Sequence, residues 1–483
     1  MTRINTNVPA LTAIHQLTAN NKSLTTSLER LSSGLRINRG ADDPAGLIAS
    51  ESLRSEIRGI STAIDNSERA INVISTADAA LGEVSKLLLE LKELTVQTAN
   101  DGGLSDDEIE ANQQQVDSLL VAIDRIANST QFNGKKLLNG QLRYTINGQD
   151  QTNLPRLQVF GARVPDNGTL NVDIAVTQSA QTAQLNIDFG GAAGFQAGGT
   201  LSSGNGVTLE IRGSLGTTLL SFASGTAASD IAQAVQNTAQ LTGVSATASA
   251  TGLAFNSTRF GSSEFVSVRA INGTFSVNSG DQGDNEDRGR DAQVFVNGQA
   301  ASVKGLTASI RTAGLDLVAE LSQNFGTTTG SDSFAITGGG ANFQIGPNVN
   351  ADGRVSVGIE SITTANLGTV QDGFLSSLGT GGSAELVSPE NLPAAERIVT
   401  AAISQISTLS GRLGGFQANQ VETNLNSLRV ALENVTASES AIRDTDYSAE
   451  VANLTRAQIL LQSTTQTLGI ANQIPQSVLS LLG

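Results

Sequence analysis

Few residues of this 483-residue chain could perform acid–base or metal chemistry. The chain has one histidine, His15, and no cysteine, whereas zinc sites and most acid–base centres rely on these residue types. The His-Glu-x-x-His motif of zinc peptidases is missing, and the middle of the chain has no histidine to pair with a serine. We therefore expect no enzyme activity, no catalytic residue, no metal site and no cofactor.

A cluster of carboxylates in the middle of the chain is the other candidate for chemistry. It consists of Asp281, Asp284, Glu286, Asp287 and Asp291. Carboxylates are good calcium ligands, but this spacing differs from that of known cation-binding loops. We expect a solvated loop here.

Charge and hydropathy exclude further classes of function. A net charge of −16 argues against nucleic-acid binding. No apolar run approaches the length of a membrane span, and the N-terminus lacks the apolar core of a secretory signal. We expect no stable membrane insertion. A cytosolic protein and a protein exported without a cleaved signal peptide both fit.

The main structural element is a long helix between Leu53 and Leu94. Its apolar residues form one stripe along about twelve turns, or roughly 60 Å. Small or polar residues interrupt the stripe at Ser67, Asp78 and Ser85. The stripe consists of Leu53, Ile57, Ile60, Ile64, Ile71, Ile74, Leu81, Leu88 and Leu91. Other helices must cover this face.

Residues 1–40 predict a basic amphipathic helix. Its apolar residues are Leu11, Ile14, Leu17, Leu24, Leu28, Leu31 and Leu35. Such a start also suits a mitochondrial transit peptide or a membrane-surface helix, but the same periodicity continues beyond residue 53 without a cleavage site. In the intervening loop, Asp42 or Asp43 is expected to cap the next helix, with Pro44 in its first turn.

The pattern changes along the rest of the chain. Ser105 to Glu108 form a capping box that begins another helix, expected to pack back on the long one. Residues 141–387 alternate apolar and polar residues and predict a β-rich region, with short helices near 229–241 and 305–315.

Helical spacing returns after Ser388. A first apolar stripe, or seam, changes its spacing near Gly414–Gly415. A last helical segment follows and is predicted to break at Pro475. The first seam contains Ile398, Ala402, Ile406, Leu409, Leu413, Phe416, Leu425, Leu428, Leu432, Val435 and Ile442, and the last segment contains Leu454, Leu461, Leu468, Val478 and Leu482.

The resulting fold class is α + β. Both chain ends form a long antiparallel, coiled-coil-like helical rod, and a β-rich domain is inserted in the middle. The extreme ends carry apolar stripes with few partners inside the chain, so these stripes either pair with each other or pack on other molecules.

Several motifs at the two ends resemble those of bacterial flagellins. Near the N-terminus they are Ile4-Asn5-Thr6-Asn7, Leu28 to Asn38, Asp42 to Leu47 and Gln131 to Leu138. Near the C-terminus they are Gly411 to Gln417, Ile442 to Tyr447 and Ala471 to Gly483, and Phe343 to Asn348 is similar to the family's hairpin segment. Residues 141–340 match no fixed pattern.

The resemblance implies three regions. Residues 1–43 and 440–483 would form an inner-tube helical domain. Residues 44–140 and 341–439 would form the rod with its hairpin. Residues 141–340 would form a variable, surface-exposed β-rich domain.

The resemblance also implies a self-assembling filament subunit for swimming motility, exported unfolded by the flagellar type III system. Its implied partners are copies of itself, an export chaperone, and the cap and hook-junction proteins. A hook–filament junction protein and an adhesin-like role of the central region are the alternatives.

One implied site departs from the family pattern. Flagellins detected by the toll-like receptor for flagellin carry Gln-Arg-x-Arg-Glu-Leu on the rod helix, where this chain has Leu89, Glu90, Lys92 and Glu93 around Leu91. Recognition by this receptor is therefore doubtful. Alternatively, Leu88, Leu89 and Leu91 simply widen the core stripe.

Overall fold

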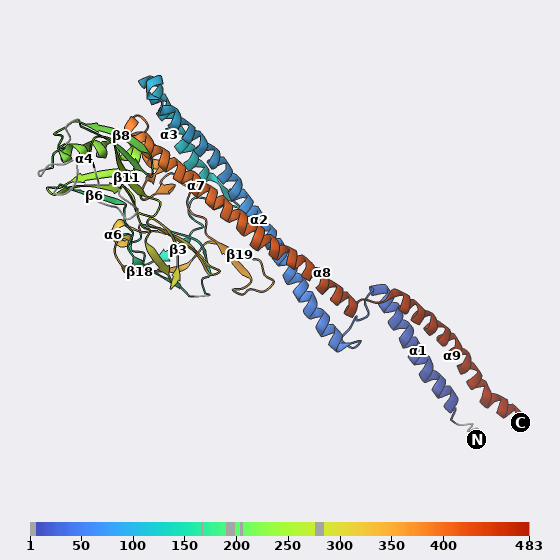
Figure 1. Ribbon diagram of the computed structural model, residues 1–483. Coiled ribbons are helices and arrows are strands. Elements are labelled where there is room, and N and C mark those ends of the chain that lie inside the picture. The colour runs from blue at the N-terminus through green and yellow to red at the C-terminus, as the bar shows by residue number, and fades with distance from the viewer. Residues whose placement is uncertain (1–5, 166–167, 190–198, 203–205, 276–284, 483) are drawn as a thin grey trace. The chain divides into compact units, whose positions relative to one another are not determined.

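The computed structural model describes residues 6–165, 168–189, 199–202, 206–275 and 285–482, and its description of side chains ends at residue 474. The predicted fold class is confirmed: both ends are helical and the middle is β-rich (Figure 1). The chain forms two compact units, one of residues 1–68, 345–353 and 423–483, the other of residues 69–344 and 354–422. The boundaries of these two units differ from those of the three domains predicted from the sequence, and the division into three domains stays a prediction.

The first unit contains an antiparallel pair of terminal helices, α1 (Val8–Ser33) and α9 (Tyr447–Leu482). Three contacts fix their direction: Arg30 with Glu450, Asn20 with Thr464, and Asn7 with Ala471. Helix α1 ends where Gly34 adopts φ +75°, the left-handed conformation that glycine adopts without steric cost.

Helix α9 does not break at Pro475, so that prediction is wrong. Proline has no N–H, and in a helix it leaves the carbonyl four residues earlier without its usual donor. Here that carbonyl belongs to Ala471, and it accepts a hydrogen bond of 2.8 Å from Asn7 Nδ2. A donor from the other end of the chain therefore compensates for the proline.

The first unit also contains the start of α2 (Pro44–Thr98) and helix α8 (Thr423–Arg443), which pack around Ile60, Ala63 and Leu428. Asp43 Oδ1 caps α2 by accepting from the Gly46 N–H. Ser67 is no gap in the stripe: it is buried in the seam, and its hydroxyl donates to the Ala63 carbonyl.

A hairpin loop of residues 345–353 packs on this helix pair. Asn424 Nδ2 donates to the Ile345 carbonyl at 2.8 Å. A Cβ on Gly59 would lie only 3.2 Å from the Pro347 carbonyl oxygen, so the glycine permits the close approach.

Helices of the second unit surround the rest of the long seam. They are the remainder of α2, η1 (Asp101–Gly103), α3 (Asp106–Ser129), η2 (Leu375–Leu378), η3 (Pro389–Asn391) and α7 (Leu392–Phe416). The predicted capping box at Ser105 and Glu108 is confirmed. The predicted gaps at Asp78 and Ser85 are filled by the preceding residue in each case. These residues are Ala77 and Val84, and both are wholly buried in the seam.

The predicted slip of the C-terminal seam is a π-helix, η4 (Gln417–Glu422). Buried Phe416 is followed by buried Val421, a step of five residues instead of three or four. A π turn accommodates one extra residue and returns the apolar side chains to the same face.

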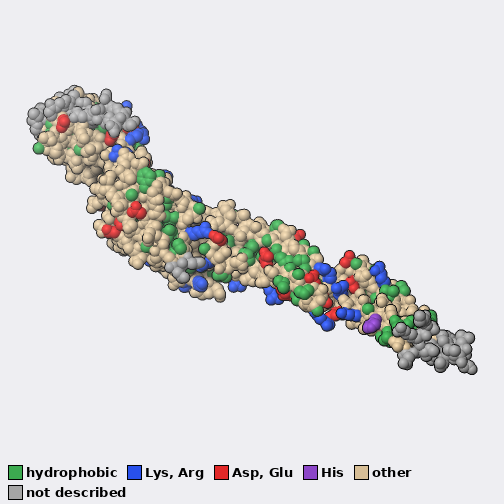
Figure 2. Space-filling model, turned by 90° about the horizontal axis from the view of Figure 1, so that it is seen from below, with side chains coloured by type: hydrophobic (Ala, Val, Ile, Leu, Met, Phe, Trp, Pro, Cys, Tyr) green, Lys and Arg blue, Asp and Glu red, His purple; other side chains and the backbone are tan. Residues whose placement is uncertain are grey.

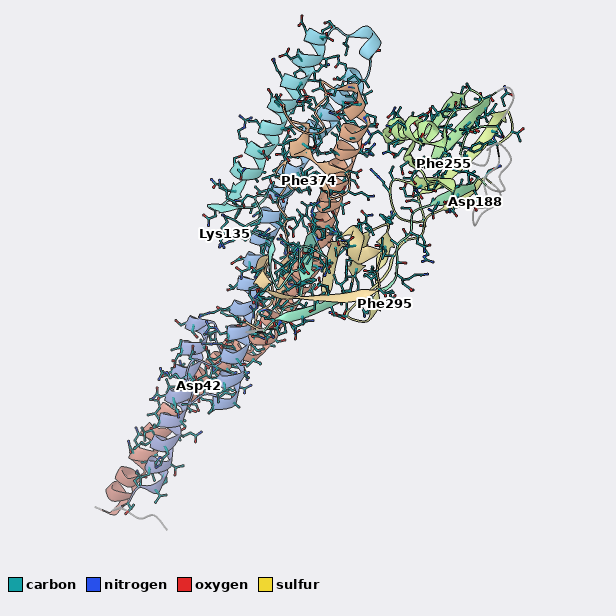
Figure 3. All side chains as sticks on the ribbon, turned by 90° about the vertical axis from the view of Figure 1, so that its left-hand side faces the viewer. Asp42, Lys135, Asp188, Phe255, Phe295 and Phe374 are labelled. Atoms are coloured by element: carbon teal, nitrogen blue, oxygen red, sulfur yellow. The ribbon has the colours of Figure 1, made fainter. Side chains whose placement is uncertain are left out.

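The central region contains two apolar cores. The first lies between the sheets β14-β13-β5-β18-β3 and β15-β16-β17-β4, and the second lies around β6-β10-β9, β12-β11-β7-β8 and α4. Figure 3 labels Phe255 in the second core, where its side chain is wholly buried. All strand pairs described in these sheets are antiparallel.

The strands of these sheets are β3 (Tyr144–Asn147), β4 (Arg156–Ala162), β5 (Leu170–Gln178), β6 (Gln184–Asp188), β7 (Val207–Gly213), β8 (Thr217–Phe222), β9 (Val244–Ala248), β10 (Gly252–Ser257), β11 (Phe265–Asn272), β12 (Glu286–Arg288), β13 (Gln293–Val296), β14 (Gln299–Ala300), β15 (Ser302–Lys304), β16 (Thr307–Arg311), β17 (Leu315–Glu320) and β18 (Gly330–Gly339). Two-stranded pairs are β1 (Gln131–Phe132) with β2 (Lys135–Lys136), β19 (Ala341–Gln344) with β20 (Arg354–Val357), and β21 (Gly368–Thr369) with β22 (Gly373–Phe374). Short helices are α4 (Ala228–Asn237), α5 (Ala239–Thr242) and α6 (Gln323–Gly326).

Two predictions about the central region need correction. The expected helix near 305–315 is β16 and the start of β17, because alternating burial pairs this segment into a sheet. The acidic cluster is not a solvated loop where it is described: Asp287 accepts from the Gln184 N–H and Asp291 from the Gly305 N–H. Asp281 and Asp284 lie outside the described residues.

Candidate assembly surface on the terminal helices

Small and polar residues form the seam between α1 and α9. Its buried residues are Ala10, Ala13, Asn20 and Ser27 on α1, and Glu450, Ala457 and Ala471 on α9. Half-buried leucines fill the positions between them, so that steps of three and four alternate as in a coiled coil. The seam therefore buries little apolar surface within the chain.

Large apolar side chains lie outside this seam. Leu11 is 51% exposed, and Ile459 is 61% exposed. The other exposed large aliphatic residues, among the described side chains of the two helices, are Val8, Ile14, Leu28, Val451, Leu460, Ile470 and Ile474. We call these nine side chains the outer apolar face. Figure 2 shows hydrophobic side chains at the surface near the single histidine, His15.

The structure divides the residues that the sequence assigned to filament assembly. Leu11, Ile14 and Leu28 belong to the outer apolar face, whereas the others that are described are half-buried. These half-buried residues are Leu24, Leu31, Leu35, Leu454, Leu461 and Leu468. The side chains of Val478 and Leu482 lie outside the described residues.

Sequence reasoning missed much of the outer apolar face. It followed one leucine stripe per helix and passed over Val8, Ile459, Leu460 and Ile470. The repeat of Ala10, Ala13, Asn20 and Ser27 was the available signal, because small residues at heptad positions mark a close helix–helix contact.

A shallow apolar groove lies beside the seam. Its volume is about 430 Å³, and its lining includes Val8, Pro9, Thr12 and Ala13 from α1 and Thr464 from α9. No group of His, Asp and Glu that could hold a metal ion is found in the part of the chain that the structure describes. Among the described residues, no helix is long and apolar enough to span a membrane.

The predicted rod seam has a different character, because its large residues face inward. Ile60, Ile74, Leu81, Leu88, Leu91, Leu413, Leu425 and Leu428 are buried, and Leu53, Ile57, Ile64, Ile71 and Leu432 are half-buried.

The residues that depart from the receptor-binding motif of other flagellins, Leu89, Glu90, Lys92 and Glu93, lie on α2. Leu89 is 55% exposed and therefore does not widen the core stripe with Leu88 and Leu91. Glu90 and Glu93 are exposed, and the Lys92 ammonium lies 4.0 Å from a Glu396 carboxylate oxygen and 3.4 Å from the Thr400 hydroxyl.

Both ends of the chain match family models. Residues 4–142 match the bacterial flagellin N-terminal helical region, and residues 397–482 match the bacterial flagellin C-terminal helical region.

Curated relatives match over nearly the whole chain. Flagellin from Salmonella muenchen is 28% identical, and flagellin A from Helicobacter pylori and flagellin B from Vibrio cholerae are each 29% identical. Each alignment covers 99% of this chain and 99% of the relative. Among solved structures, FliC from Burkholderia pseudomallei is 14% identical to this chain, and the match covers 74% of this chain and 99% of FliC with a TM-score of 0.26.

Proposed function

We infer that this chain, which belongs to the bacterial flagellin family and is a structural subunit of the flagellar filament, polymerises through the outer apolar face of its terminal helices. The observation that supports this proposal is the outward position of Leu11, Ile14 and Ile459 on helices whose own seam consists of small residues, polar residues and half-buried leucines. Large apolar side chains exposed together on one pair of helices favour an interaction site. Copies of the same chain are the natural occupants in a filament.

The geometry of a polymer requires two different faces on each subunit. A heterologous contact that does not close into a ring continues indefinitely and produces a filament. Burial of about 1,000 Å² of apolar surface per end would contribute ~25 kcal/mol gross at ~25 cal/mol per Å². Association also costs translational, rotational and side-chain freedom, so assembly would be sensitive to small changes of this face.

The finer features of this role form part of the proposal. We propose that residues 1–43 and 440–483 line the inside of the tube, that residues 44–140 and 341–439 surround them, and that residues 141–340 face solvent. The subunit would leave the cell unfolded through the flagellar type III system, without a cleaved signal peptide. An export chaperone would bind the C-terminal segment, and the cap and hook-junction proteins would contact the polymer ends.

Substitution of the outer apolar face tests the proposal. The double variant Leu11→Ser, Ile14→Ser should leave the monomer folded, because both side chains are about half exposed, but should abolish seeded polymerisation. The matched control is Leu219→Ser, Ile271→Ser, which removes two similarly exposed apolar side chains from the central β region. Electron microscopy and sedimentation measure polymer. Normal filaments from the Leu11, Ile14 variant would contradict the proposal.

A further inference from the structure

A basic groove lies between α1 and α9, apart from the apolar groove. Its volume is about 390 Å³, and its lining includes Lys22, Arg30, Arg456, Asn20 and Asn453. Glu450 is the acidic side chain of the lining, so the groove carries three positive charges and one negative charge in a chain whose net charge is −16.

The charged side chains of this groove differ in whether they have an ion-pair partner. Arg30 lies 3.6 Å from Glu450, which is buried, and this pair belongs to the helix–helix seam. Arg30 Nε is buried and has no hydrogen-bond partner in the described structure. Lys22 and Arg456 are exposed, and neither forms an ion pair within the described residues. Two cations therefore remain free at the rim.

We propose that this groove binds a carboxylate side chain of a second copy of the chain. The proposal rests on the polymerisation described above and identifies a polar contact within it. Lys and Arg form charge-assisted hydrogen bonds with carboxylates, and the amides and hydroxyls of the lining supply further donors.

Two observations favour a second copy as the occupant. Leu460 lines the groove and belongs to the outer apolar face, so the basic and apolar surfaces are continuous. The chain has 45 Asp and Glu against 29 Lys and Arg, so a neighbouring copy presents an excess of carboxylates. Complementary charges of this kind determine orientation and register at an interface more than they raise affinity. The groove would therefore align subunits that the apolar face holds together.

The test compares critical concentrations for seeded polymerisation of the full chain. The variant Lys22→Gln, Arg456→Gln removes the two free cations and leaves the Arg30–Glu450 pair intact. The control Arg212→Gln, Lys304→Gln removes the same charge from exposed positions of the central β region. At about 50 mM NaCl, the first variant should show a critical concentration about tenfold above that of the control. At about 1 M NaCl the two should agree, because salt screens exposed charges. Circular dichroism of the monomers checks that both variants are folded.

Equal critical concentrations of the two variants at low salt would overturn the groove proposal while filaments still form, and polymerisation would remain supported. Failure of the wild-type chain to polymerise on seeds would instead overturn the proposed function itself. If about 10 mM sulfate, at constant ionic strength, lowers the critical concentration of the wild type but not of the Lys22, Arg456 variant, the groove holds a free anion, and assignment to a second copy is wrong.

Discussion

The terminal helix pair and the rod seam follow the same alternation of three- and four-residue steps but bury their large side chains to different extents, since the seam leucines of the terminal pair are only half-buried and further large side chains lie outside that seam. In the rod, Leu81, Leu88 and Leu91 are wholly buried. In the terminal pair, alanine, serine and asparagine occupy the seam, and Leu11 and Ile459 face outward. The rod is thus stabilised within one molecule, whereas the terminal pair leaves its apolar surface available to other molecules.

Truncation of one large side chain in each region gives the strongest test of this difference. Leu88→Ala should lower the free energy of unfolding of the monomer by about 2–5 kcal/mol, because it removes a fully buried side chain and leaves a cavity. Ile459→Ala should leave the monomer unchanged and raise the critical concentration for polymerisation. Urea unfolding of the monomer and sedimentation of the polymer measure the two quantities. If both variants lost the same monomer stability, Ile459 would stabilise the monomer as Leu88 does, and the proposed difference between the two regions would be wrong.

The carboxyl of Glu360, a half-buried residue of the second unit, offers a test within that unit. Burial raises the pKa of Glu360 to about 7, against the opposing influence of Arg143, the Val159 backbone N–H and Arg156. The folded state therefore keeps a proton that the unfolded state releases above its ordinary pKa of 4.5. Stability should fall as the pH rises from this value to about 7, by at most about 3 kcal/mol.

The variant Glu360→Gln removes this titration. It should be more stable than the wild type at pH 8, by about 1–3 kcal/mol, and no more stable at pH 4. Thermal unfolding at the two pH values measures the effect, and Glu110→Gln at an exposed position is the control. A wild type whose stability is constant between pH 4 and pH 8 would contradict this prediction.

The next prediction concerns the outer surface of the rod. We predict weak or no activation of the toll-like receptor for flagellin, because Glu90 places a carboxylate where detected flagellins carry arginine. The variant Leu89→Gln, Glu90→Arg should raise signalling at least about tenfold, since loss of a charged pair at an interface costs ~2–5 kcal/mol. Reporter cells treated with monomer measure the response. Full signalling by the wild type would show that the receptor contact lies elsewhere.

The smallest expected effect concerns helix caps in the two regions. Ser105→Ala removes the capping box of α3 and should lower monomer stability by about 1 kcal/mol. Asn7→Ala removes both the cap of α1 and the hydrogen bond to Ala471, so it should increase hydrogen exchange in the terminal helices with little change in the unfolding of the rod. Exchange rates that are unchanged by Asn7→Ala would show that this contact does not hold the two ends together.

The sequence alone determined the helical ends, the β-rich middle and several large buried residues of the rod, but it missed small buried residues such as Ala63, Ala70 and Ala77. Helical periodicity from Ile60 to Leu91, the capping residues Ser105 and Glu108, and the alternation in β5 and β7 are local features, so short stretches of sequence contain them. The motifs at both ends were sufficient to identify the family for the same reason.

The tertiary structure alone decided which side of each terminal helix faces its partner. Periodicity shows that a helix has an apolar side, but the partner determines whether that side is buried within the chain, and here Ala13 and Ser27 take the inner positions. Pro475 remains within a helix because Asn7, far away in the sequence, donates to the carbonyl that the proline leaves free. Such compensation depends on residues that only folding brings together, so helix-breaking rules based on neighbouring residues cannot predict it.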